Sequence, residues 1–97
     1  MEIRWDPRKD LINRRKHGLS FELAQHVFDD PLHLSSDAYE ENGEWRFDTL
    51  GRLFGGLLVI VAHTWHMDEE GEHIRLISAR KADKTERIHY ENAPPYR

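Results

Sequence analysis

Lys16 and His17 adjoin each other in a basic N-terminal segment, and their side chains suit acid–base and phosphate chemistry. Cleaving an RNA phosphodiester without a metal needs a base, an acid and positive charge on the phosphorane. Histidine titrates near neutrality and can fill either proton-transfer role, while lysine supplies charge. The residues leave a second interpretation open, because a cation at a helix C-terminus also stabilises the helix dipole.

Four arginines on or beside predicted strands form a second set of cations. Arginine presents a planar fork that matches phosphate, so Arg80 and Arg46 rank first for catalysis, ahead of Arg75 and Arg52. Surface ion pairing accounts equally well for any one of them. Arg75 and Arg80 have opposite parity along one predicted strand. We therefore expect them to share a site only if the sheet curves or Arg80 lies past the last regular pair.

The candidate side chains fall into two groups by expected role. The predicted catalytic set is Lys16, His17, Arg46 and Arg80, and the predicted RNA-binding set is Lys9, Arg14, Arg15, Arg52 and Arg75. We expect no metal site and no cofactor, since His63 and His66 lie three apart on a strand and so face opposite sides. Trp5 and Trp45 could stack on bases, but we expect both in the core.

The composition predicts a single domain over residues 1–97. Its 38% hydrophobic and 33% charged residues indicate one modest core and a highly charged surface. The one uninterrupted apolar run, residues 57–62, is too short to span a bilayer, and the N-terminus lacks an apolar signal region. The absence of cysteine fits a cytoplasmic protein, which is the location we expect.

Charge is distributed unevenly along the chain, although the net charge is only −4. Residues 1–20 carry six Lys and Arg against three Asp and Glu, whereas residues 21–50 carry one against eight. Residues 51–97 are balanced at seven of each. This pattern predicts a basic face for phosphates and an acidic face for a basic partner, although simple solvation of the charges explains it equally well.

Hydrophobic periodicity predicts the elements that would position these residues. Asp6 and Pro7 are typical of a helix start and Gly18 of a helix end, and from Leu32 the period changes to two. The acidic residues 37–44 are expected to form a turn. The predicted order is a strand over 2–5, helices over 7–17 and 21–28, strands from 32 and over 45–50, 57–65 and 72–80, a helix over 81–92, and an end of order at Pro94-Pro95. This order indicates an α+β fold with a mainly antiparallel sheet.

Two segments of the chain resemble a known family. The first is WDPRKDLINRRKHGLSFELAQHVFDDP, from Trp5 to Pro31, and the second is RLISARKA, followed by Glu86, Arg87 and Tyr90. Their order resembles that of the BrnT family. That resemblance implies a RelE-like fold and the activity of a ribonuclease toxin in a type II toxin–antitoxin pair. It also implies a cognate BrnA-like antitoxin that neutralises the toxin and binds operator DNA, so that the complex represses its own operon. The chain would act on RNA, would meet DNA only through the antitoxin, and would not contact a membrane.

Two other functions remain open at the level of sequence. One is a non-catalytic interaction module on the same fold, because fold alone does not determine function. The other is an RNA-binding domain that forms salt-sensitive complexes without cleaving.

Overall fold

The computed structural model describes residues 1–93, so the Pro94-Pro95 pair lies outside the described residues. The helices are α1 (Pro7–His17), α2 (Phe21–Ala24) and α3 (Lys84–Asn92), with 3₁₀ turns η1 (Gln25–Asp29) and η2 (Phe54–Gly56). The strands are β1 (Glu2–Trp5), β2 (Leu34–Ser35), β3 (Tyr39–Glu41), β4 (Glu44–Arg52), β5 (Leu58–His63), β6 (His66–Asp68) and β7 (Gly71–Lys81).

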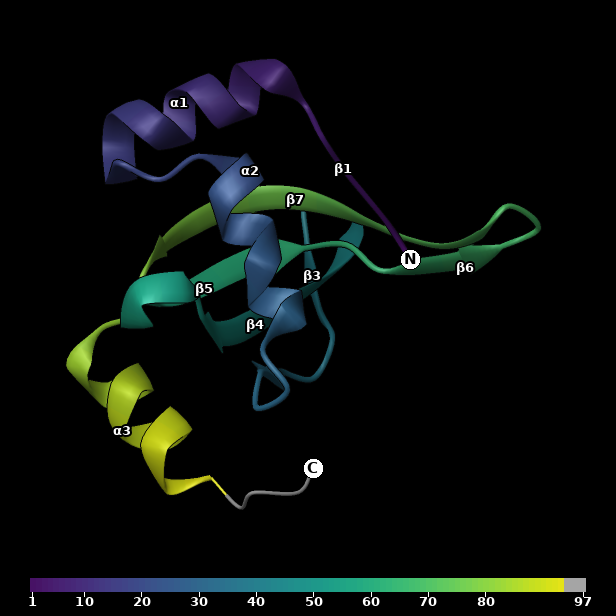
Figure 1. Cartoon of the computed structure of the whole chain (residues 1–97). Coiled ribbons are helices and arrows are strands. Elements are labelled where there is room, and N and C mark those ends of the chain that lie inside the picture. The colour runs from purple at the N-terminus through teal and green to yellow at the C-terminus, as the bar shows by residue number, and fades with distance from the viewer. Residues whose placement is uncertain (94–97) are drawn as a thin grey trace.

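The strands form one sheet in the order β1-β7-β5-β4-β2, with β3 paired to β4 and β6 to β7. Among the described strands, only β1 runs parallel to its neighbour β7, and the other pairs are antiparallel. In Figure 1, α2 and η1 cross the sheet while α1 lies beyond β7 and α3 lies at the far end of the molecule. The α+β fold predicted from the sequence is confirmed.

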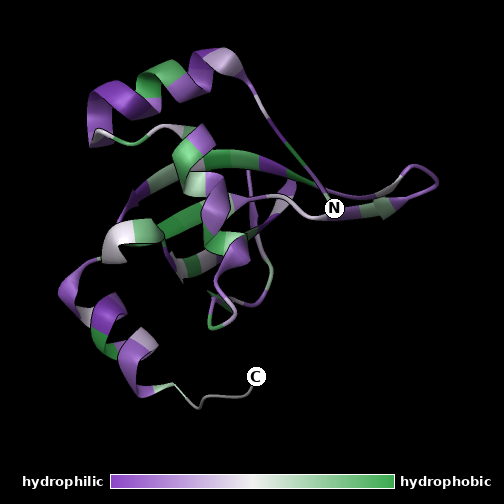
Figure 2. Cartoon of the chain, viewed as in Figure 1, coloured by the Kyte–Doolittle hydropathy of each residue, from purple (hydrophilic) through white to green (hydrophobic). Residues whose placement is uncertain are grey.

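The sheet buries apolar side chains on both faces. Figure 2 shows the central strands as largely apolar and α1 as largely hydrophilic. The larger cluster, beneath α2 and η1, comprises Leu19, Phe21, Ala24, Val27, Leu53, Val59, Val61, Ile74, Leu76 and Ala79. The smaller cluster, against α3, comprises Leu50, Leu58 and Tyr90. We call the part of the α3-side face of the sheet that α3 leaves uncovered the open sheet face.

Helix α1 begins and ends as its sequence predicts. The Asp6 side chain accepts a hydrogen bond from the Arg8 N–H, and Gly18 closes the helix with a left-handed φ of 71°. Asn13 is the one buried residue of this helix, and it docks α1 onto the edge of β7. Its Nδ2 donates to the Ala79 and Leu19 carbonyls at 2.9 and 3.0 Å, and the Ala79 N–H donates to its Oδ1 at 3.0 Å.

A register shift in β7 changes which arginines share a face. Leu76 pairs with His63 whereas Ser78 pairs with Ala62, so Ile77 is an extra residue between them. The core-facing residues are therefore 74, 76 and 79 rather than an unbroken alternation. The predicted parity was wrong: Arg75 lies on the same face as Ser78 and Arg80 because the bulge resets the alternation.

Four further expectations differ from the structure. The acidic residues 37–44 contain strand β3 as well as a turn, in which Asn42 has a φ of 53°. The second helix changes to a 3₁₀ turn at Gln25, and the last helix begins at Lys84 because Asp83 provides its N-cap. Trp5 packs on the core as expected, in edge contact with Phe21, but Trp45 is 61% exposed because none of the described helices covers that end of β4.

Candidate functional site

A shallow depression of about 280 Å³ lies between α1 and β7. Its basic side chains, Lys9, Lys16 and His17, come from one face of α1, and Ile77 and Ser78 of β7 form the opposite side. Within residues 1–93, no ion pair or side-chain hydrogen bond engages these three side chains, nor those of Arg14 and Arg15 on the same helix. The depression can therefore accept an anionic ligand without first breaking a salt bridge.

A second, smaller hollow of about 60 Å³ adjoins the first on the open sheet face. Asp48 of β4 and Arg80 of β7 stand at its sides, and Ile60 and Ala62 of β5 form its floor. Ser78 lines both hollows. The predicted catalytic residues Lys16, His17 and Arg80 are thus brought together around Ser78, on two elements that are distant in sequence.

Arg80 is held by a carboxylate of α3. Its Nη1 and Nη2 donate to the two oxygens of Glu86 at 2.8 and 2.9 Å. Glu86 also accepts a hydrogen bond from the Asp83 N–H, because the two residues form a capping box at the start of α3. The hydrogen bond from Arg80 lowers the pKa of Glu86, so this carboxylate is ionised at neutral pH.

Arg46 and Arg75 meet on one carboxylate elsewhere on the open sheet face. Arg75 pairs with Glu44, which also accepts from Arg46 Nε at 3.4 Å, and Arg46 Nη1 reaches Glu41 at 2.7 Å. Burial by itself would raise the pKa of Glu44, but the charges and hydrogen bonds of Arg75 and Arg46 bring it below its usual value. These two arginines would have to exchange carboxylates for phosphate in order to bind RNA.

Arg52 lies apart from the other candidates, at the far end of β4. Its Nη1 donates to the Gly56 carbonyl at 2.7 Å, and its guanidinium lies 5.1 Å from the centre of the Tyr90 ring. Asp30 joins the same group, accepting from the Tyr90 hydroxyl at 2.6 Å and from the Arg52 N–H at 2.8 Å. This arrangement fastens α3 to β4 and gives Arg52 a structural role, although within residues 1–93 its guanidinium forms no ion pair.

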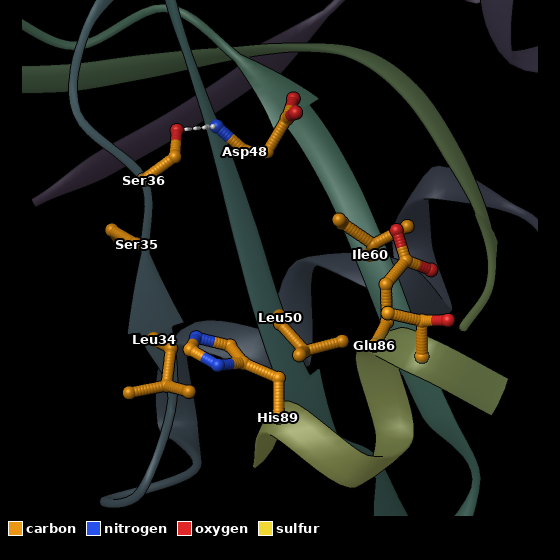
Figure 3. Close-up of a pocket in the computed structure, with 9 residues that line it drawn as sticks. Leu34, Ser35, Ser36, Asp48, Leu50, Ile60, Glu86 and His89 are labelled. Carbon is orange, nitrogen blue, oxygen red and sulfur yellow. Dashed lines mark hydrogen bonds between the residues drawn. The ribbon is translucent and has the colours of Figure 1, made fainter. Parts of the chain in front are cut away.

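An apolar cavity of about 310 Å³ separates α3 from β4 and β2. Figure 3 shows the Glu86 carboxylate beside Ile60, and His89 facing Leu34 across the cavity. Asp48 and Glu86 are not among the site residues predicted from the sequence, all of which are basic. The signals were present, since Asp48 shares a face with Arg46 by strand parity and Glu86 follows Asp83 at capping spacing.

His63 is fully buried and lies outside both hollows. Its Nδ1 donates to the Thr64 carbonyl at 2.8 Å and its Nε2 lies 2.6 Å from the Thr49 hydroxyl. Burial lowers the pKa of His63 below 6.5. Among residues 1–93, no group of three or more His, Asp or Glu side chains is placed to hold a metal ion.

In the described part of the chain, no helix has the length and apolarity needed to cross a membrane.

Comparison with known proteins places the chain in a family. A model of the ribonuclease toxin BrnT of type II toxin–antitoxin systems matches residues 5–86. The crystal structure of the ribonuclease toxin BrnT of Brucella abortus superposes with a TM-score of 0.60 and 27% sequence identity. That match covers 87% of this chain and 99% of the other. No curated protein matches the chain. Because the model covers most of the sequence and the fold agrees, this chain belongs to the BrnT family of ribonuclease toxins of type II toxin–antitoxin systems.

Proposed function

We propose that the chain is a metal-independent endoribonuclease that acts in the cytoplasm and is neutralised by a cognate BrnA-like antitoxin. The observation that carries the proposal is the meeting of Lys16, His17 and Arg80 around Ser78 in a chain of this family. In this site His17 transfers a proton, while Lys16 and Arg80 stabilise the phosphorane.

The remaining cations extend the site along the path of an RNA strand. Lys9, Arg14 and Arg15 are exposed on α1 and bind phosphates on one side of Ser78. Arg46 and Arg75 lie on the open sheet face on the other side, where Arg46 assists catalysis and Arg75 binds RNA. Arg52 is the weakest RNA contact of the set, since the Tyr90 ring and the Gly56 carbonyl hold it away from the site.

The acidic residues 21–50 are the proposed surface for the antitoxin. Glu22, Asp29, Asp37, Glu40 and Glu41 are exposed there, and a basic segment of a partner would complement them. The complex would repress its own operon, with the antitoxin making the contacts to DNA. Association is expected to be fast at low salt and to slow as ionic strength rises, because the interaction is between opposite charges. Association that is insensitive to salt would contradict this docking surface.

The first experiment incubates purified chain with a labelled RNA in the presence of a chelator. Cleavage that persists supports a metal-independent endoribonuclease, whereas cleavage that stops with the chelator and returns with added divalent metal contradicts the mechanism. Binding without products would favour a plain RNA-binding domain, and neither binding nor products would favour a non-catalytic interaction module. Expression without the antitoxin is expected to arrest bacterial growth.

Variants of the two central residues test their roles. His17→Ala is expected to lower the cleavage rate by roughly 10²–10⁴-fold, the usual scale for general acid–base catalysis. Arg80→Ala is expected to cost a similar factor, and Arg80→Lys to recover part of it because an ammonium cannot copy the planar fork. Thermal melts of each variant provide the control. A folded variant that cleaves at the wild-type rate would remove that residue from the site.

A further inference from the structure

The basic residues around Ser78 do not provide a general base for the proposed reaction if His17 acts as the acid. If His17 protonates the leaving 5′-oxygen, a different group must take the proton from the attacking 2′-hydroxyl. A carboxylate can do so only if it is ionised and is not already occupied by a cation. Among residues 1–93, the carboxylates on or beside the open sheet face include those of Glu41, Glu44, Asp48 and Glu86.

Three of these carboxylates are occupied by arginines, and Glu41 is one of them because it accepts a hydrogen bond from Arg46. Glu86 binds Arg80 through both oxygens, and Glu44 binds Arg75 and Arg46. Asp48 differs from them: its Oδ1 accepts a hydrogen bond from the Tyr39 hydroxyl at 2.7 Å, and within residues 1–93 its Oδ2 has no hydrogen-bond or ion-pair partner. Because Glu86 takes up the fork of Arg80, that arginine does not form an ion pair with Asp48 although both line the same hollow.

The sheet register places Asp48 opposite the other groups of the site. Asp48 pairs with Ala62, and Ala62 pairs with Ser78, so the three side chains form one row across β4, β5 and β7. The small Ala62 leaves the middle of this row open. Asp48 therefore faces Ser78 and Arg80 across the 60 Å³ hollow, and Ser78 in turn borders the depression that holds His17.

The surroundings of Asp48 orient its carboxylate. The backbone N–H of Asp48 donates to the Ser36 hydroxyl at 2.9 Å and is therefore not available to the site. Figure 3 shows the Asp48 carboxylate turned away from Ser36. Burial, followed by the hydrogen bond to Asp48, raises the pKa of Tyr39 to about 12, so the phenol remains a donor at neutral pH. The Tyr39 hydroxyl thus fixes one oxygen of the Asp48 carboxylate and leaves the other oxygen available.

We propose that Asp48 is the catalytic base of this ribonuclease, a role that rests on the proposed function. Its Oδ2 takes the proton of the 2′-hydroxyl as the 2′-oxygen bonds to phosphorus. The bond from phosphorus to the 5′-oxygen breaks, and His17 gives its proton to that oxygen. The products are a 2′,3′-cyclic phosphate and a 5′-hydroxyl, and proton exchange with water restores Asp48 and His17. Tyr39 is a positioning residue that orients the carboxylate.

The test compares Asp48→Asn with the wild type in single-turnover cleavage of an RNA oligonucleotide that contains the cleaved linkage. Asparagine keeps an oxygen for the Tyr39 hydroxyl but cannot take up a proton. The cleavage rate is expected to fall by roughly 10²–10⁴-fold. RNA affinity is expected to hold or improve, because a negative charge is removed. Glu69→Gln is the matched control: it also removes one negative charge by an amide substitution, at an exposed position outside both hollows and outside the acidic residues 21–50, and should cleave normally.

Two further readouts separate a base from a structural residue. The wild-type rate should fall at acid pH, as expected for a reaction that needs a general base, and the residual rate of Asp48→Asn should lack that dependence. Tyr39→Phe keeps the carboxylate and removes its donor, so it should lose less than about tenfold, below the usual contribution of a general base. A loss in Tyr39→Phe as large as that in Asp48→Asn would overturn the assignment, because the pair would then act as a structural unit.

The outcomes also separate this inference from the proposed function. If the wild type cleaves RNA and a folded Asp48→Asn cleaves within about threefold of it, Asp48 is not the base and the ribonuclease proposal stands. If folded wild type yields no products under any condition, the proposed function fails and the assignment of Asp48 fails with it. Products that end in a 3′-phosphate monoester from the outset, with no cyclic phosphate at early times, would overturn the proton transfer assigned to Asp48.

Discussion

Replacing Asn13 with alanine should destabilise the chain more than its place on a hydrophilic, mostly exposed helix suggests. The asparagine side chain satisfies three backbone groups, namely the Leu19 carbonyl and the carbonyl and N–H of Ala79. Beyond Leu76, the partner of the last residue of β1, no strand formed by residues 1–93 lies beside the outer edge of β7, so Asn13 replaces the missing ladder contacts. Alanine would leave all three groups without partners at a buried position.

The expected loss follows from the cost of unsatisfied groups. A buried donor or acceptor left without a partner costs about 1–3 kcal/mol. Water can reach some of these groups when α1 shifts, so we expect a total of about 2–4 kcal/mol rather than the full sum. That is a large fraction of the ~5–15 kcal/mol by which small proteins are stable. It corresponds to a fall in Tm of at least about 8 °C for a chain of this size.

The assay is urea denaturation followed by tryptophan fluorescence, with Arg15→Ala as the control on the same helix. Arg15 is exposed and has no side-chain partner in residues 1–93, so its replacement should change the free energy of unfolding by less than about 0.5 kcal/mol. An Asn13→Ala variant that differs from the wild type by no more than the control would refute this account of how α1 is attached. Asn13→Asp should not rescue stability, because a carboxylate cannot donate to the two carbonyls.

Gly51→Ala should destabilise the chain by about 1–3 kcal/mol in the same assay, because an added Cβ would lie 2.7 Å from the Val27 carbonyl oxygen; unchanged stability would contradict the close contact of η1 with β4. His63 is buried with a pKa below 6.5, so the unfolded state binds its proton more readily. The free energy of unfolding should therefore not depend on His63 above about pH 6.5 and should fall as the pH drops below that value, by up to about 1.4 kcal/mol per pH unit. Urea denaturation between pH 5 and 8 should show this dependence of the unfolding free energy on pH in the wild type and a weaker one in His63→Leu. An equal dependence in both would rule out His63 as the cause. Glu86→Gln removes the charge opposite Arg80 and should lower the free energy of unfolding most at neutral pH, where the wild-type carboxylate is ionised and its pKa is below the usual value. The difference between Glu86→Gln and the wild type should shrink as the pH falls through the pKa of Glu86, and a difference that does not change with pH would contradict an ionic role.

The sequence by itself determined those features that depend on residues close together in the chain. The capping residues Asp6 and Gly18 fix the ends of α1, because each needs only neighbouring backbone groups. Alternating polarity predicted most strands and the α+β class, since side chains two apart share a face. The order of short motifs indicated the BrnT family, which the family model and the fold confirmed.

The site depended on contacts that no local pattern contains. The bulge at Ile77, which brings Arg75 onto the face of Arg80, arises from the pairing of β7 with β5. The Asn13 contact joins residues 66 positions apart, and it places Lys16 and His17 beside Ser78. Glu86 reaches Arg80 only because α3 folds back over the sheet. Strand register and the docking of helices are set by the packing of the whole core, so only the tertiary structure could decide which charges neutralise one another and which remain available for RNA.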